Sequence, residues 1–61
     1  MDEWKDVIGK QLKVIFEDGR EHVSKKEGKL ISTTNTHILL LINEKIEGIR
    51  KTDIKRFEEI Q

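Results

Sequence analysis

The sequence predicts a mostly β fold, in which five strands form one small, strongly bent barrel after a short N-terminal helix. The 61 residues include nine isoleucines and three valines, which favour strands, and no alanine, which argues against a packed helical bundle. Apolar and polar residues alternate with a period of two over residues 11–16. Gly28 and Gly48 interrupt later apolar segments at points where a strand can bend. We expect one domain, residues 1–61, with a core of marginal size.

A short helix is expected over residues 2–8. Asp2 can cap its start, and Gly9 suits its C-terminal end. Its apolar face would be made by Trp4, Val7 and Ile8. We expect Trp4 to anchor this helix on the core.

A hairpin is predicted between residues 11–16 and residues 21–28. In the first strand Leu12, Val14 and Phe16 share one face, and Asp18-Gly19 is a strong hairpin signal. The second strand is weakly hydrophobic, so we expect it at an edge of the sheet, where its lysines discourage pairing between molecules. Gly28 suggests a bulge or a sharp bend before the strand continues through residues 29–32.

Residues 37–42, HILLLI, form a continuous apolar run after a turn through Asn35. Such a run is typical of a strand covered on both faces. The second cover would come from the helix or from a neighbouring subunit. Residues 43–45 predict a tight turn.

The last two strands are predicted over residues 46–50 and 54–60. A bulge at Gly48 would turn both Ile46 and Ile49 inward. Residues 51–53 predict a turn, and a short helix capped there by Thr52 or Asp53 is the alternative to the final strand. This order of elements fits a barrel of SH3-like type.

Composition limits the function classes. The formal net charge is zero, which is poor evidence for non-specific binding to nucleic acid. With no cysteine and two histidines, the chain has no disulfides and offers little for a structural zinc, so oligomerisation remains as a stabiliser. The longest apolar run, Ile38 to Ile42, is too short to span a bilayer, and a cysteine-free chain fits a cytoplasmic location. No nucleophile–base pair, phosphate loop or metal-ligand spacing is visible, so we expect no enzyme, no metal and no cofactor.

At two places the chain resembles the Sm-like family, which includes the Sm, LSm and Hfq proteins. Gly28-Lys29-Leu30-Ile31, the turn at Asn35 and the strand from His37 are similar to the first Sm motif. Ile49-Arg50, followed by Ile54, is similar to the second. The resemblance covers nearly the whole chain, and it implies a ring of six or seven subunits that binds single-stranded RNA at the loops of the two motifs.

Carried over by position, the resemblance implies an RNA site at Asn35, His37, Arg50 and Lys51. Asn35 stands where the family usually has aspartate, and His37 where the side chain that stacks on a base belongs. Arg50 matches the arginine of the second motif, whereas Lys51 replaces its glycine. Ile38 replaces the asparagine that reads the base edge.

Each site residue also has a structural interpretation. His37 could simply begin a strand, Arg50 could pair with Glu47 or Asp53, and Asn35 could support a left-handed turn. Two function hypotheses follow: a ring-forming protein that binds single-stranded RNA, or a non-enzymatic module for protein interaction or self-assembly. Basic residues close to His37 and Arg50 would favour RNA. The candidates are Lys51, Lys55 and Arg56.

Overall fold

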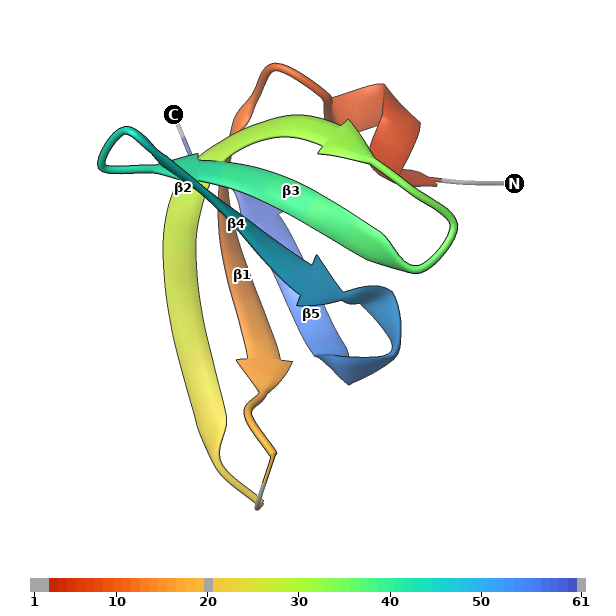
Figure 1. Ribbon diagram of the computed structural model, residues 1–61, viewed down its shortest axis with the longest axis vertical. Coiled ribbons are helices and arrows are strands. Elements are labelled where there is room, and N and C mark those ends of the chain that lie inside the picture. Colours follow the sequence, from red (N-terminus) through yellow and green to blue (C-terminus); the bar gives the residue numbers. More distant parts are fainter. Residues whose placement is uncertain (1–2, 20, 61) are drawn as a thin grey trace.

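The computed structural model describes residues 3–19 and 21–60 as a five-stranded antiparallel sheet with the order β4-β3-β2-β1-β5 (Figure 1). The strands are β1 (Gln11–Glu17), β2 (Val23–Thr33), β3 (His37–Ile42), β4 (Lys45–Arg50) and β5 (Ile54–Glu59). Two 3₁₀ turns, η1 (Glu3–Val7) and η2 (Lys51–Asp53), precede β1 and β5. The mostly β fold with five strands is therefore confirmed, and so is the final strand.

The sheet is bent but not closed. β4 and β5 form its two edges and do not pair with each other in the described chain. Instead β4 crosses the first half of β2, and the Lys26 ammonium binds the Glu47 carboxylate there. The short η2 turn then leads the chain into β5, which pairs with β1.

The second strand, β2, lies between β3 and β1 in the strand order, but its first part pairs with β1 alone, so the edge position predicted for residues 21–28 is confirmed for Val23 to Gly28. Its first part pairs with β1, from Val23 to Lys29, and its second part pairs with β3, from Lys29 to Thr33. The first part is weakly hydrophobic because one face meets solvent and Lys26 stands on the other. Low hydrophobicity here accompanies both this partial exposure and the edge position of the segment.

Gly28 is the point of closest approach between β2 and β3. A Cβ at this position would lie 2.6 Å from Ile42 Cγ1 and 2.6 Å from the Leu41 carbonyl oxygen. The pairing with β1 continues unbroken through Gly28, and the irregularity on the β3 side lies between Leu30 and Ser32. Gly28 therefore permits a bend by close packing, and the bulge belongs to Ile31.

The core lies on the inner face of the bent sheet. Its buried members are Trp4, Leu12, Val14, Phe16, Leu30, Ile38, Leu40 and Ile49. The alternation predicted for β1 is confirmed by Leu12, Val14 and Phe16. Trp4 covers one side of this core and packs on Phe57, with ring centroids 4.1 Å apart.

The N-terminal helix is shorter than predicted. It is a 3₁₀ turn that ends at Val7, and Asp2, its predicted cap, lies outside the described residues. Trp4 is 7% exposed and Val7 packs on the core, but Ile8 is 44% exposed. Ile8 leaves the apolar face because the turn ends before it, at Val7, and Gly9, whose φ of +92° suits a C-terminal stop, follows it.

The predicted bulge at Gly48, which would have turned both Ile46 and Ile49 inward, is wrong. The β3–β4 register has no shift at Gly48, so Ile49 pairs with Ile38 inside while Ile46 pairs with Leu41 outside. Ile46 is consequently 63% exposed, and Leu41 is 38% exposed. Within the described residues η1 packs on the inner core, so the helix does not cover the outer face of β3, and cover by a neighbouring subunit stays a prediction.

Both predicted hairpins are present. The Asp18 N–H donates to the His22 carbonyl at 2.6 Å in the loop between β1 and β2. The β3–β4 turn is a two-residue connection through Asn43 and Glu44, with φ of 50° and 67°. Two successive positive φ angles are the mark of a type I′ turn, which matches the twist of the strands.

We expect Gly28→Ala to destabilise the protein by at least about 1–3 kcal/mol, because the new methyl group meets a side chain and a backbone carbonyl. Gly48→Ala is the matched control, since its nearest heavy atom would be 3.5 Å away. Urea denaturation of both variants measures the difference. Equal losses from the two substitutions would show that the approach at Gly28 is not tight.

Trp4→Ala should cost about 3–5 kcal/mol, as large core truncations do, and can unfold so small a domain outright. Ile8→Ala, four positions later but exposed, should change the free energy of unfolding by less than about 1 kcal/mol. Thermal melts followed by circular dichroism test the pair. An unchanged melting temperature in Trp4→Ala would mean that η1 does not cover the core.

Glu44→Gly should stabilise the protein by about 1 kcal/mol, because glycine adopts the left-handed conformation of this turn without strain. Glu27→Gly, inside β2, should instead lose about 0.5–1 kcal/mol. The two midpoints of urea unfolding should therefore move in opposite directions. A destabilised Glu44→Gly variant would rule out the type I′ turn.

Candidate functional site

The predicted site residues come from two turns that meet at one end of β3 and β4. The Lys51 N–H donates to the Thr36 carbonyl oxygen at 2.8 Å, which joins the β2–β3 turn to the start of η2. Beside this bond His37 and Arg50 are direct partners in the β3–β4 register. The fold thus places His37, Arg50 and Lys51 together, with Asn35 in the adjoining turn. We call this region the turn junction.

Threonine hydroxyls organise the β2–β3 turn. The Thr34 Oγ1 accepts from the His37 N–H at 3.0 Å and from the Thr36 N–H at 3.2 Å, and the Thr34 N–H donates to the His37 carbonyl at 2.8 Å. Asn35 has an ordinary negative φ and is exposed, so its suggested role in a left-handed turn is wrong. Thr34 holds the turn instead, and a threonine two or three residues before the bonded amide is the sequence signal for it.

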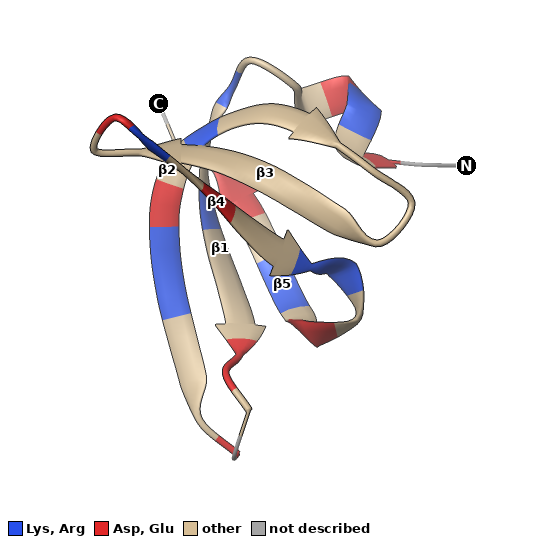
Figure 2. Cartoon of the chain, viewed as in Figure 1, with Lys and Arg blue, Asp and Glu red and all other residues tan. Residues whose placement is uncertain are grey.

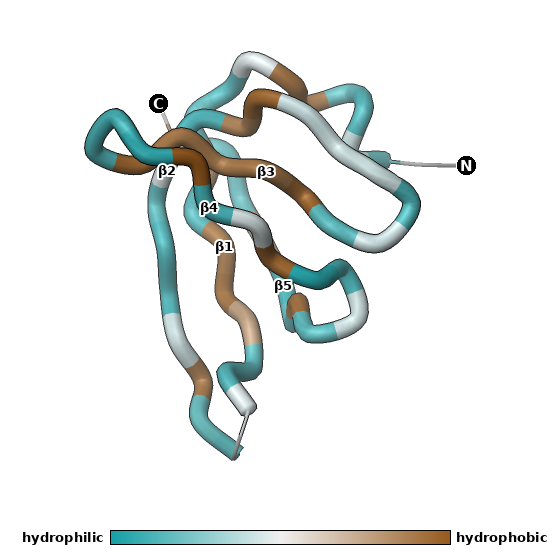
Figure 3. Tube along the Cα trace, in the orientation of Figure 1, coloured by the Kyte–Doolittle hydropathy of each residue, from teal (hydrophilic) through white to brown (hydrophobic). Residues whose placement is uncertain are grey.

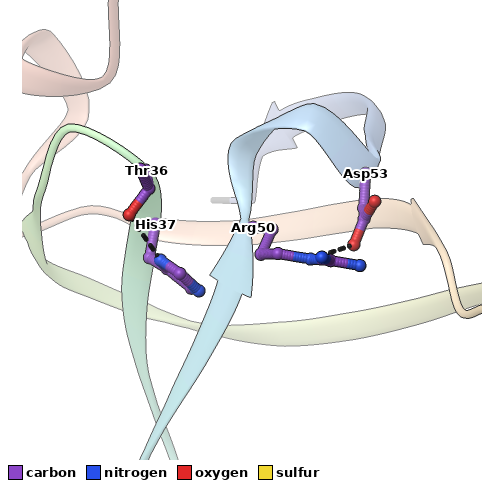
Figure 4. Close-up of polar contacts among 4 residues, drawn as sticks. All are labelled: Thr36, His37, Arg50 and Asp53. Atoms are coloured by element: carbon purple, nitrogen blue, oxygen red, sulfur yellow. Dashed lines mark hydrogen bonds and ion pairs between the residues drawn. The ribbon is translucent and has the colours of Figure 1, made fainter.

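The imidazole of His37 is half-buried and held by its neighbours. Its Nδ1 lies 2.8 Å from the Thr36 Oγ1, a hydrogen bond that fixes the orientation of the ring (Figure 4). A Cβ on Gly48 would lie 3.8 Å from His37 Cδ2 and 3.5 Å from Leu39 Cδ2. Gly48 therefore leaves room beside the ring, which is a role that the sequence did not indicate.

Arg50 makes one of the ion pairs that its structural interpretation allowed. Its Nε donates to the Asp53 Oδ2 at 3.0 Å, while Glu47 binds Lys26 instead (Figure 4). The side chain of Arg50 is still 65% exposed. Because only Nε is engaged, the two terminal nitrogens of the guanidinium can still donate to a ligand.

Ile38 cannot contact a ligand at the turn junction. It is fully buried in the core and pairs with Ile49 on the inner face, whereas His37 and Arg50 lie on the outer face. Strand alternation separates the two neighbours, since successive side chains point to opposite faces.

Of the further basic residues named by the sequence, Lys51 lies at the turn junction and the other two belong to β5. Lys55 lies 3.7 Å from Glu17, and Arg56 pairs in register with Ile15 of β1. Along β5 the basic residues lie at the end next to η2 and the acidic residues at the other end (Figure 2). At the turn junction the basic residues are Arg50, which pairs with Asp53, and Lys51, which lines one depression together with Lys55 and Arg56.

The outer side of β1 and β5 shows the same charge pairing. A hydrogen bond and the positive charge of Lys13 lower the pKa of Glu58, with a smaller contribution from Arg56. Because the folded-state pKa is lowered, this stabilising contribution is present at neutral pH and is lost as the pH falls through that pKa. Glu58 is exposed, so solvent screens the interaction strongly.

Two shallow depressions flank η2. One is lined by Glu3, Trp4, Lys51 and residues 54–57, and the other by Phe16, Lys26, Ile49, Arg50 and Asp53 among others. In residues 3–19 and 21–60, no group of three or more His, Asp or Glu side chains is placed to hold a metal ion. His22 and His37 do not form such a group.

Comparisons with known proteins gave no match among family models, curated proteins or solved structures. Within the part of the chain that the structure describes, none of the helices is long and apolar enough to cross a membrane.

Proposed function

We propose that this chain is a non-enzymatic, Sm-like protein that binds single-stranded RNA at the turn junction and assembles with copies of itself. The supporting observation is the Lys51–Thr36 hydrogen bond, which brings the loops of the two resembling motifs together. The strand order also agrees with a small, bent barrel that stays open between β4 and β5.

In this proposal His37 stacks on a base, while Arg50 and Lys51 bind phosphate or a base edge. The bond to Thr36 orients the imidazole before the ligand arrives, which lowers the cost of ordering it. The bond from Asp53 orients the guanidinium in the same way and leaves its terminal nitrogens for oxygen acceptors. Asn35, exposed beside them, offers a carboxamide to a neighbouring nucleotide.

Discrimination among bases should be weak. The position at which the family reads the base edge is Ile38, which is buried and has neither donor nor acceptor. Stacking and phosphate contacts tolerate any base. The ligand class that fits these residues is therefore a short unpaired strand of little sequence preference.

Self-assembly is supported by the two open edges of the sheet. β4 and β5 each pair on one side within the described chain, which leaves a row of backbone donors and acceptors for another strand. In the proposed oligomer β4 of one subunit pairs with β5 of the next, and a ring of six or seven closes this head-to-tail contact.

The binding test is fluorescence anisotropy with labelled oligomers of uridine, adenosine and cytidine at two salt concentrations. His37→Ala should lose about 1–3 kcal/mol for each stacked base, with little dependence on salt. Arg50→Ala or Lys51→Ala should weaken binding and flatten its salt dependence, because fewer counterions are released. Lys25→Ala, a lysine on the first half of β2, is the matched control and should bind like the wild type. If the folded protein binds none of the oligomers at low salt, the proposal fails.

The assembly test is light scattering over a range of protein concentrations, together with thermal melts. We expect a homo-oligomer whose melting temperature rises with concentration, because association stabilises only the folded state. Gly48→Pro, on the open edge strand, should weaken association, because Gly48 and Leu39 form a non-hydrogen-bonded pair, so the Gly48 N–H faces the open edge and proline has no N–H to donate. A protein that remains monomeric at high concentration would refute the assembly proposal and leave RNA binding to be judged separately.

A further inference from the structure

The outer face of the sheet carries an apolar strip across three neighbouring strands. In one row of the register Lys29 of β2 pairs with Leu41, and Leu41 pairs with Ile46 of β4. In the next row Leu39 stands beside Gly48. The trace of β3 and the adjoining start of β4 is hydrophobic (Figure 3). We define the outer apolar strip as Ile31, Leu39, Leu41 and Ile46.

This strip exposes more apolar surface than a strand pattern requires. Leu41 and Ile31 are each 38% exposed, and Ile46 is 63% exposed. The register shift between Leu30 and Ser32 adds Ile31 as an extra residue on β2. Branched apolar side chains that adjoin on three strands favour a protein-binding surface over scattered exposure.

Two lysines border the outer apolar strip; the lysines elsewhere include paired ones and two, Lys5 and Lys25, for which the described residues provide no ion pair. Four lysines of the remaining surface pair with a glutamate: Lys10 with Glu59, Lys13 with Glu58, Lys26 with Glu47, and Lys55 with Glu17. Lys29 lies in the same row as Leu41 and Ile46, and Lys45 precedes Ile46 at the start of β4. Neither of these two lysines has an ion-pair partner among the residues that the structure describes.

We propose that the outer apolar strip binds a partner protein through a segment in which acidic and apolar residues alternate. Apolar side chains of that segment cover Leu41 and Ile46, and its carboxylates pair with Lys29 and Lys45. Burying the lysine stems against apolar surface while their ammonium groups meet carboxylates satisfies both parts of each side chain. The partner's charge would also speed encounter and set the register of docking.

A second copy of this chain fits the strip less well. A two-fold contact between two strips would gather Lys29 and Lys45 from both copies, with Glu44 of each β3–β4 turn and Glu27, two residues before Lys29 on the same face, as nearby carboxylates. Like charges in one interface are costly. The strip also lies on the face of β3 and β4, whereas the proposed assembly uses the strand edges. This inference is therefore independent of the proposed RNA binding.

The test is a methyl NMR titration of the full chain with a synthetic peptide of alternating leucine and glutamate. The methyl signals of Leu39, Leu41 and Ile46 should shift on addition of this peptide. A peptide with lysine in place of each glutamate should leave them unchanged. Equal binding of both peptides, or shifts confined to other methyl groups, would overturn the proposal.

Substitutions test the contribution of the lysines and that of the apolar side chains separately. Lys29→Glu and Ile46→Thr should each weaken binding of the acidic peptide about tenfold, a change of about 1.4 kcal/mol. Lys25→Glu makes the same charge change on the half of β2 that pairs with β1, and should retain wild-type affinity. Ile46 is exposed, so thermal melts should show that Ile46→Thr folds normally.

Two further outcomes are decisive. His37→Ala should bind the acidic peptide like the wild type, which separates failure of this proposal from failure of RNA binding. The proposed docking would be overturned if Lys29→Glu and Lys25→Glu weakened peptide binding equally. Loss of self-association in Ile46→Thr would also overturn it, because the strip would then serve a contact between copies.

Discussion

The bent sheet depends on the close approach of β2 to β3 at Gly28. A glycine here lets the Leu41 carbonyl and the Ile42 side chain come within a distance that no other residue could tolerate. One long strand can therefore pair with β1 through its first part and with β3 through its second. Its inner face then encloses Leu12, Val14, Leu30, Ile38 and Leu40, all of them fully buried. In a chain of 61 residues with no disulfide, this small core supplies most of the available stability.

The same bend determines where a ligand-binding surface can form. It brings β4 across β2, where Lys26 and Glu47 join, and leads the chain into η2 beside the β2–β3 turn. Residues from the two motifs thereby meet although thirteen positions separate His37 from Arg50. Strand alternation then divides β3 by face, with Ile38 and Leu40 in the core and Leu39 and Leu41 outside. The turn junction and the outer apolar strip consequently adjoin on the outer face of β3, and the open strand edges form a separate surface.

Local patterns in the sequence were sufficient to place the strands and turns. They were not sufficient to predict which strand faces are covered or how neighbouring strands are aligned. Alternation in residues 11–16 identified β1 and its buried face, and Asp18-Gly19 marked the hairpin, because both signals are local. The apolar run of residues 37–42 did not reveal which side of β3 stays exposed, since coverage depends on distant elements. Gly48 was misjudged because a glycine in a strand can mark a bulge or only a lack of side chain, and the register decides between them. A family resemblance predicted that His37, Arg50 and Lys51 meet. The sequence left Glu47 and Asp53 open as partners of Arg50, and the folded chain selects Asp53, whereas the role of Thr34 shows only in the folded chain.

The central claim is that the two turns joined by the Thr36–Lys51 hydrogen bond form one ligand surface. An NMR titration of ¹⁵N-labelled protein with a short oligouridine tests it most directly, because each backbone amide reports separately. The account predicts that the amides of Thr36, His37, Arg50 and Lys51 shift together and saturate at the same concentration. Shifts confined to one of the two turns, or centred on the paired charges of β1 and β5, would contradict it.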